Sequence, residues 1–172
     1  MMYGSVLSGA LAGHVHGTAA YDVTSTGEPA GWRPHIWTAL RYESGAQMQH
    51  LRAFLLSEGN RYQQLTLAAN DLDPRSVPDA LADGLDGWSF LMRTADKDFA
   101  LAYFEQKALT ARMKGFTPRA KYSWTWFDPR NGRWERAVTL QTDAEGTLIA
   151  PAFAAGGKQA ARDIAAKIVR AP

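Results

Sequence analysis

A run of alternating aromatic residues followed by a turn constrains the fold of this chain more than any other feature. Tyr122, Trp124 and Trp126 alternate with small polar residues, which is the period of a β-strand with two unlike faces. Residues 128–132 then read Asp-Pro-Arg-Asn-Gly. Proline fixes φ near a turn value, and Asn-Gly tolerates the positive φ that a tight reversal requires. We therefore predict a β-hairpin, with residues 133–138 as the returning strand.

The composition of the 172-residue chain is ordinary for a folded protein, with 46% hydrophobic and 21% charged residues. A formal net charge of +2 is too small to indicate a polyanionic partner, so we expect no nucleic-acid binding. The absence of cysteine excludes disulfides and thiolate metal sites. The apolar run at residues 6–12 is too short to span a bilayer and follows no cationic segment. We expect no membrane contact and no signal peptide in this chain, which leaves its localisation open.

Two prolines and flanking charges at residues 73–79 predict a division between two unlike parts, residues 1–78 and residues 79–172. The first part has a helical pattern. A first helix, ending by Gly13, is predicted from apolar residues spaced i, i+3, i+4 and i+7, namely Tyr3, Val6, Leu7 and Ala10. A second helix is expected to begin at Pro34, since proline suits a first helical turn.

The third predicted helix has the spacing of a capping box, with Ser44 as N-cap and Gln47 reaching back to it. Gly59 suits the end of this helix. Its apolar stripe consists of Met48, Leu51, Phe54 and Leu55.

After residue 78 the pattern changes to the period of strands. Short strands are expected at residues 88–92, 99–103, 109–113, 121–127, 133–140, 148–150 and 163–169. The alanine-rich segment at residues 159–171 would suit a helix by propensity. We favour a strand over residues 164–169, because Ile164 and Ile168 alternate there with other residue types. Antiparallel strands at this spacing predict a β-sandwich, and hence an α+β chain.

Two segments of residues 79–172 carry a family resemblance. They are Trp-Phe-Asp-Pro-Arg-Asn-Gly at residues 126–132, with the aromatic strand before it, and Asp-Ile-Ala-Ala-Lys-Ile at residues 163–168. This part of the chain resembles the β-sandwich domain that is named for collagen binding in a collagenase. That domain follows an apiosidase-like (β/α)8 barrel in a group of bacterial glycoside hydrolases. The family usually has tryptophan where this chain has Ile164.

Residues 1–78 are similar to the C-terminal segment of the barrel itself. Residues 7–17 resemble the passage from helix seven into strand eight, although a tyrosine is common where His16 stands. Residues 37–40 and 45–51 resemble helix eight and its approach. The resemblance therefore implies a helical remnant of a TIM barrel followed by an antiparallel β-sandwich.

The resemblance also implies a parent glycoside hydrolase with two catalytic carboxylates on earlier barrel strands. A complete barrel typically needs ~250 residues, which is far more than precede the division. We therefore predict no catalytic residue in this chain, no cofactor, and no activity of the chain alone. In the intact protein the resemblance implies carbohydrate binding, with polysaccharide side chains as substrate. A missing barrel portion, encoded in the same gene or separately, would be the protein partner.

Four residues are substrate-binding candidates through this resemblance. His14 and His16 would lie at the end of barrel strand eight, where residues face the active site. Trp32 and Trp37 follow and could stack on a sugar ring, although such tryptophans also fix loops to a fold. A metal site at the two histidines would need a third ligand such as Asp22, and no spacing selects one, so we predict no metal.

A second class of function stays open, in which the sandwich is a non-catalytic module that binds a glycan or collagen. Tyr122, Trp124, Trp126 and Trp134 would then form an exposed row for stacking on sugar rings or on collagen prolines. The inner face of a sandwich, however, needs large apolar side chains at alternating positions. We therefore expect Trp124 and Trp126 to lie in the core.

Overall fold

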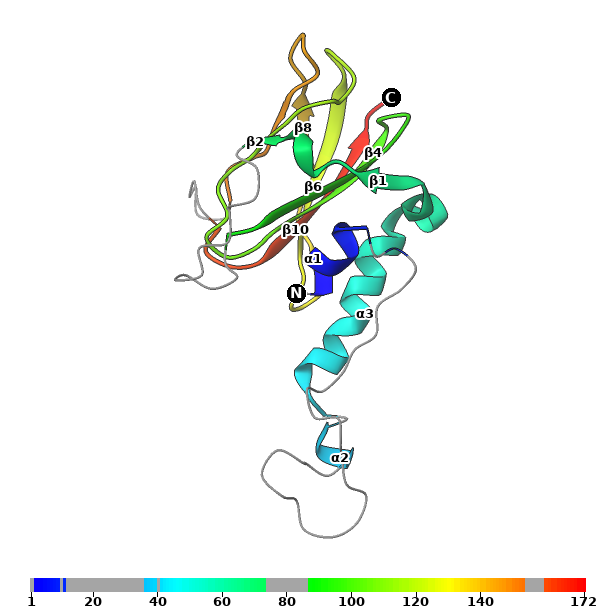
Figure 1. The fold of residues 1–172 in the computed structure, drawn as a ribbon, viewed down its shortest axis with the longest axis vertical. Helices are drawn as coiled ribbons and strands as arrows, with labels where there is room; N and C mark the ends of the chain where they lie inside the picture. The colour runs from blue at the N-terminus through cyan, green and yellow to red at the C-terminus, as the bar shows by residue number, and fades with distance from the viewer. Residues whose placement is uncertain (1, 10, 12–35, 40, 74–86, 154–159) are drawn as a thin grey trace.

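The computed structural model describes residues 2–9, 11, 36–39, 41–73, 87–153 and 160–172. These residues form two antiparallel sheets with helices against one of them (Figure 1). The helical segments are α1 (Met2–Leu7), α2 (Ile36–Ala39) and α3 (Glu43–Leu55), and the 3-10 segments η1 (Leu56–Gln64) and η2 (Ala69–Asp71). None of these helices is long and apolar enough to cross a membrane, as judged over the described residues.

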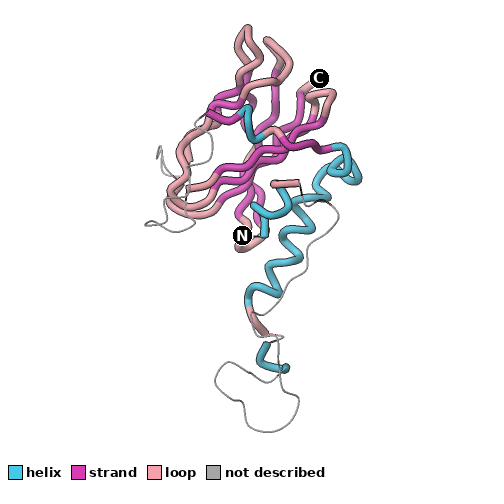
Figure 2. Tube along the Cα trace, in the orientation of Figure 1, coloured by secondary structure: helices cyan, strands magenta, loops and turns pink. Residues whose placement is uncertain are grey.

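The larger sheet has seven strands in the order β1-β3-β4-β10-β6-β7, and β8 also pairs with β6. Their bounds are β1 Leu65–Leu67, β3 Ser89–Thr94, β4 Phe99–Phe104, β6 Lys121–Asp128, β7 Arg133–Trp134, β8 Val138–Gln141 and β10 Ile164–Arg170. The smaller sheet has the order β2-β5-β9, with bounds β2 Leu72–Asp73, β5 Arg112–Met113 and β9 Leu148–Ile149. Figure 2 shows the strands gathered at one end of the molecule and α2 at the other. The predicted α+β class and antiparallel strands are confirmed.

Strand β10 lies at the centre of the larger sheet, which confirms the strand predicted at residues 164–169. It pairs antiparallel with both β4 and β6, so that Ala166 stands opposite Ala102 and Trp126. Ile164, Ala165, Ala166 and Ile168 are all buried. The small side chains of Ala165 and Ala166 suit the centre of the sheet, because β4 and β6 on either side supply bulky aromatic side chains.

The hairpin predicted from the aromatic run is present, with a break in its second strand. Gly132 has φ of +70° in the turn, and its N–H donates to the carbonyl oxygen of Asp128 (2.9 Å). Phe127 stands opposite Trp134, but Trp124 stands opposite Val138, so the register shifts by one residue between β7 and β8. The continuous strand expected over residues 133–140 is therefore wrong, because a bulge divides it.

The two sheets enclose the first hydrophobic core. Trp124 is fully buried and Trp126 is 6% exposed, with their ring centroids 4.9 Å apart in an edge-to-face arrangement. Tyr122 is also fully buried. The expectation that the two tryptophans are core residues is confirmed, and the exposed row of aromatic residues is excluded. Other members of this core include Leu72 and Met113 of the smaller sheet and Phe104 and Ile168 of the larger one.

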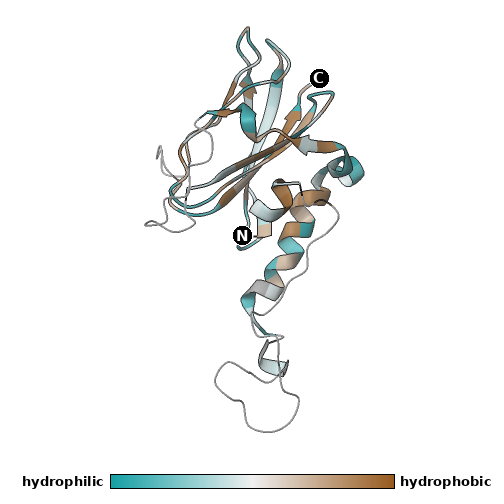
Figure 3. Cartoon of the chain, viewed as in Figure 1, coloured by the Kyte–Doolittle hydropathy of each residue, from teal (hydrophilic) through white to brown (hydrophobic). Residues whose placement is uncertain are grey.

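Helices α1 and α3 cover the opposite face of the larger sheet and form the second core. Its buried members are Tyr3, Val6, Leu7, Leu51, Phe54, Leu65, Met92, Phe99, Leu101, Tyr103, Phe127 and Ala165. Side chains alternate between the two faces of β6, so neighbouring residues belong to different cores. Phe127 points to the helices, and Trp126 points to the other sheet. The central strands are coloured mostly as hydrophobic in Figure 3, as expected for a sheet that is covered on both faces.

Arg93 of β3 connects the two sheets. Its Nη2 donates to Oδ2 of Asp71 (2.7 Å), just before β2, and its Nη1 donates to the carbonyl oxygen of Lys114 (2.7 Å), just after β5. The guanidinium also lies 5.2 Å from the ring centroid of Phe116. The Arg93 side chain is 13% exposed and that of Asp71 is 36% exposed, so the ion pair lies at the edge of the molecule with its guanidinium mostly shielded from water.

The helices agree with their predicted apolar faces but differ at their ends. Tyr3, Val6 and Leu7 are buried, as are Leu51 and Phe54 of α3; Ala10, Gly13 and Pro34 lie outside the described residues. The capping box at Ser44 is wrong, because the N-cap of α3 lies two residues earlier in the sequence. Its N-cap is Tyr42, without a side-chain cap, and Gln47 donates to Glu43 instead (3.0 Å). Gly59, with φ of +60°, marks a kink within η1 rather than the end of α3.

Two strands were not predicted, and two are shorter than predicted. β1 and β2 pair with β3 and β5, so residues before the expected division take part in both sheets. The division itself, at residue 78, lies outside the described residues. The strands expected at residues 109–113 and 148–150 are each reduced to two residues.

Candidate functional site

The structure does not bring together the four residues that the sequence predicted to bind substrate. His14, His16 and Trp32 lie outside the described residues. Trp37 lies in α2, where its side chain is 56% exposed. α2 stands away from both sheets (Figure 1), so Trp37 has no aromatic partner from the sandwich.

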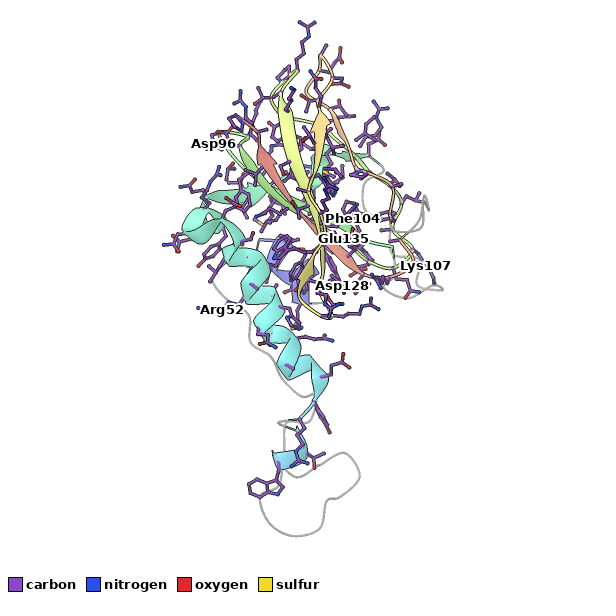
Figure 4. All side chains as sticks on the ribbon, turned by 180° about the vertical axis from the view of Figure 1, so that it is seen from behind. Arg52, Asp96, Phe104, Lys107, Asp128 and Glu135 are labelled. Atoms are coloured by element: carbon purple, nitrogen blue, oxygen red, sulfur yellow. The ribbon has the colours of Figure 1, made fainter. Side chains whose placement is uncertain are left out.

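A polar cluster that the sequence analysis did not single out surrounds Asp128, at the end of β6 (Figure 4). The Asp128 side chain is 8% exposed. Its Oδ1 accepts from the main-chain N–H (3.0 Å) and Nε (3.3 Å) of Arg130. Its Oδ2 accepts from Nη2 of Arg130 (3.2 Å) and Nδ2 of Asn131 (3.1 Å), and lies 3.4 Å from Nη2 of Arg162. The carboxylate therefore holds the hairpin turn and joins it to the segment before β10.

These contacts determine the ionisation of Asp128. Burial raises the pKa of the carboxyl, but the hydrogen bonds from Arg130 and the charges of Arg130 and Arg162 lower it more. The net result is a pKa below the usual range of aspartate. A general acid must hold a proton near neutral pH, so Asp128 is unsuited to that role.

The lowered pKa predicts a pH dependence of stability. A carboxyl whose folded-state pKa lies below its unfolded value of about 3.9 stabilises the fold above that pH, and the contribution is lost as the pH falls through the folded value. Asp128→Asn should lower the free energy of unfolding at pH 6 by about 1–2 kcal/mol, since an amide has no negative charge and only one oxygen to accept from the donors around it. The parent should then lose more stability than the variant between pH 6 and pH 2.

Urea unfolding at several pH values measures this difference. Asp96 and Asp143 also have lowered pKa values, but they are present in both proteins, so their effect cancels in the comparison. Parallel stability curves for the parent and Asp128→Asn would contradict the role assigned to this carboxylate.

A second polar contact lies at the same end of the sheet. The hydroxyl of Tyr103 donates to Oδ2 of Asp163 (2.7 Å), and the N–H of Gln106 donates to Oδ1 (2.9 Å). Burial and the bond to Asp163 raise the pKa of Tyr103. Tyr3 of α1 stacks on Tyr103 with centroids 5.3 Å apart. Burial, and then the charge of Asp128, raise the pKa of Tyr3 as well, so both phenols stay protonated.

Ring contacts hold helix α3 on the larger sheet, and a charge contact holds the η1 segment that follows it. Phe54 lies 5.4 Å from Phe127 and 6.0 Å from Trp134, centroid to centroid. Lys167 of β10 pairs with Glu58 at 2.7 Å, and its ammonium lies 5.1 Å from the Trp134 ring centroid. At Gly132 a side chain would collide with the imidazole of His50, so the glycine permits the close approach of α3 to the hairpin turn.

This arrangement supports positioning rather than catalysis. Glycoside hydrolysis by two carboxyls needs one that is protonated and one that is ionised. Asp128 is kept ionised by two arginines, and Asp163 is occupied by a tyrosine and a main-chain N–H. Within the described ranges, no three His, Cys, Asp or Glu side chains lie close enough together to hold a metal ion.

The comparisons with known proteins give a likeness of fold. No family model matches this sequence, and no curated protein matches it. Among solved structures, a protein described as a glycoside hydrolase is similar over 83% of this chain and 28% of its own, with 15% identity and a TM-score of 0.54. A glycoside hydrolase family 5 protein from Bacteroides vulgatus ATCC 8482 is similar over 87% of this chain and 30% of its own, with 14% identity and a TM-score of 0.56.

The extent of the likeness is informative. This chain spans less than a third of the length of either similar protein. Residues 65–172, which hold every strand of the described residues, are 108 of 172 residues, less than two thirds of the chain. A match that covers 83% of the chain must therefore take in part of residues 1–64 as well. The shared fold extends beyond the two sheets into the N-terminal segment.

Proposed function

We propose that this chain is the C-terminal region of a bacterial glycoside hydrolase-like protein. In this proposal residues 1–78 are the last segment of an apiosidase-like TIM barrel, and residues 79–172 are an accessory β-sandwich of the collagen-binding-named type. The carrying observation is that the likeness covers most of this chain but under a third of two glycoside hydrolases. The hairpin and the central β10, on which the family resemblance rests, are both present in the fold.

The proposed role of the chain is structural support for a catalytic portion elsewhere in the protein. The carboxylates at the end of the sheet are engaged by arginine, tyrosine and main-chain donors, which suits positioning. In the intact protein the ligand is a carbohydrate, with polysaccharide side chains as the substrate class. His14, His16, Trp32 and Trp37 are the residues of this chain that we propose to contact it.

The alternative, a stand-alone module that binds glycan or collagen, is less well supported. It relied on an exposed aromatic row, and Tyr122, Trp124 and Trp126 are buried. Trp134 is 37% exposed, but its ring packs against Phe54 and Phe127. A flat aromatic platform for sugar stacking is therefore not formed by these four side chains.

The genomic sequence upstream of the Met1 codon tests the proposal. We expect a coding region, in frame or immediately adjacent, for seven strand-helix units with two carboxylate residues at strand ends. Upstream DNA that encodes no such units would contradict the proposal. The longer polypeptide, or the pair of polypeptides, would then be produced for the experiments below.

A further inference from the structure

Asn131 and Gly132, in the turn between β6 and β7, are the only Asn-Gly pair of the sequence. This pair is prone to spontaneous deamidation, because glycine has no side chain to shield its main-chain nitrogen. The nitrogen attacks Cγ of the asparagine, and the Cγ–Nδ2 bond breaks as the new bond forms. The proton of the glycine N–H leaves with Nδ2 as ammonia. Water then opens the cyclic imide at either carbonyl and leaves aspartate or isoaspartate.

The main-chain nitrogen that would attack is engaged in this structure. The N–H of Gly132 donates to the carbonyl oxygen of Asp128 (2.9 Å). The nitrogen must give up this proton to attack, so the hydrogen bond has to open first. The imidazole of His50 lies against the α-carbon of Gly132, but it does not receive the proton as long as that bond is formed.

The side-chain amide of Asn131 is held at both ends. Its Oδ1 accepts from the main-chain N–H of Arg133 (3.0 Å), which is an Asx turn, and its Nδ2 donates to Oδ2 of Asp128 (3.1 Å). Rotation of Cγ toward the nitrogen of Gly132 would break both bonds. Asp128 is itself buried and contacted by Arg130 and Arg162, so its carboxylate cannot follow the amide.

We propose that Asn131 is a latent deamidation site, which the buried carboxylate of Asp128 and the turn around it keep unreactive in the folded chain. Asn131 is exposed to water, so its protection comes from the three hydrogen bonds and not from burial. Deamidation would place a carboxylate where Nδ2 now donates, and the new charge would repel Asp128. Isoaspartate would also lengthen the main chain of the turn. The inference is independent of the proposed function.

Deamidation rates measured by peptide mass spectrometry test the proposal. The purified 172-residue chain is incubated folded and, in a second sample, unfolded in guanidinium chloride at the same mildly alkaline pH. Because three hydrogen bonds must open before the reaction, conversion at residue 131 should be about 10–100 times slower in the folded sample. Asn60 and Asn70, the other asparagines of the chain, precede residues with side chains and serve as slow internal references.

Two variants separate the carboxylate from the general stability of the turn. Asp128→Ala removes the acceptor of Nδ2, whereas Arg162→Ala takes a charge away from Asp128 and leaves all three hydrogen bonds in place. Circular dichroism establishes that each variant is folded. Folded Asp128→Ala should deamidate at residue 131 about 10 times faster than the parent, and Arg162→Ala should keep the parent's rate.

Equal rates at residue 131 in the folded and the unfolded parent would overturn the proposal. So would an unfolded chain in which Asn131 reacts no faster than Asn60 and Asn70, or a folded Asp128→Ala that is no faster than Arg162→Ala. If Asp128→Ala does not fold, Asp128→Asn takes its place, since its amide has a single oxygen for the donors around it. The rate of that variant at residue 131 must then exceed the parent's rate, and an equal rate would overturn the proposal.

Discussion

Replacing Trp124 with alanine is expected to lower the free energy of unfolding by about 3–5 kcal/mol. The indole is fully buried between the sheets, beside Trp126, and stands opposite Ile168 on one neighbouring strand and Val138 on the other. No group of the described residues accepts a hydrogen bond from its Nε1, so the expected loss comes from packing and the cavity. Urea unfolding followed by circular dichroism measures the change.

A second tryptophan provides the control for this variant. Trp37 is 56% exposed in α2, so Trp37→Ala should change the free energy of unfolding by less than about 0.5 kcal/mol. If Trp124→Ala were as stable as Trp37→Ala, the aromatic row of β6 would not be core. The stand-alone binding module would then regain its stacking surface.

Phe54→Ala is expected to lower the free energy of unfolding by a similar amount, about 3–5 kcal/mol, because it weakens the packing of α3 on the larger sheet. Phe54 is fully buried and contacts rings from three other elements. Its centroid lies 5.5 Å from that of Tyr3, 5.4 Å from Phe127 and 6.0 Å from Trp134. The variant should also make the amides of α3 exchange with deuterium faster than those of β10, because the sheet retains its other core.

Gln49→Ala serves as the matched control on the same helix, since Gln49 is exposed. Alanine has the higher helix propensity, so this variant should be at least as stable as the parent. A Phe54→Ala protein with the stability and exchange rates of Gln49→Ala would mean that α3 does not rest on the sheet in solution.

The parts of the fold that local patterns determine could be predicted from the sequence. The alternation of β6, the Asn-Gly turn and the apolar stripe of α3 each lie within a few residues, and each is present. β1 and β2 could not be predicted, because strands of two or three residues have no period to read and depend on partners far along the chain. The bulge between β7 and β8 is a one-residue shift in register, which the composition of residues 133–140 does not reveal.

The contacts of the polar cluster around Asp128 also differ in whether the local sequence indicates them. Arg130 and Asn131 bind Asp128 from within the turn, and the Asp-Pro-Arg-Asn-Gly sequence is a sufficient signal for such contacts. Arg162 reaches Asp128 only because β10 lies beside β6. The bond from Tyr103 to Asp163 joins residues 60 positions apart, and no local signal marks it. Sequence patterns therefore predicted the turn but not the cluster that surrounds it.

Sugar release from branched plant polysaccharides tests most directly whether this chain belongs to a glycoside hydrolase without carrying its catalytic groups. The 172-residue chain and the longer polypeptide, or the reassembled pair, are compared at equal molarity against a blank without protein. We predict release above the blank by the longer polypeptide or pair, and none by the 172-residue chain, whose described carboxylates near the hairpin are held by arginine and tyrosine. Release by the 172-residue chain at the rate of the longer protein would contradict this result and place the catalytic groups within residues 1–172.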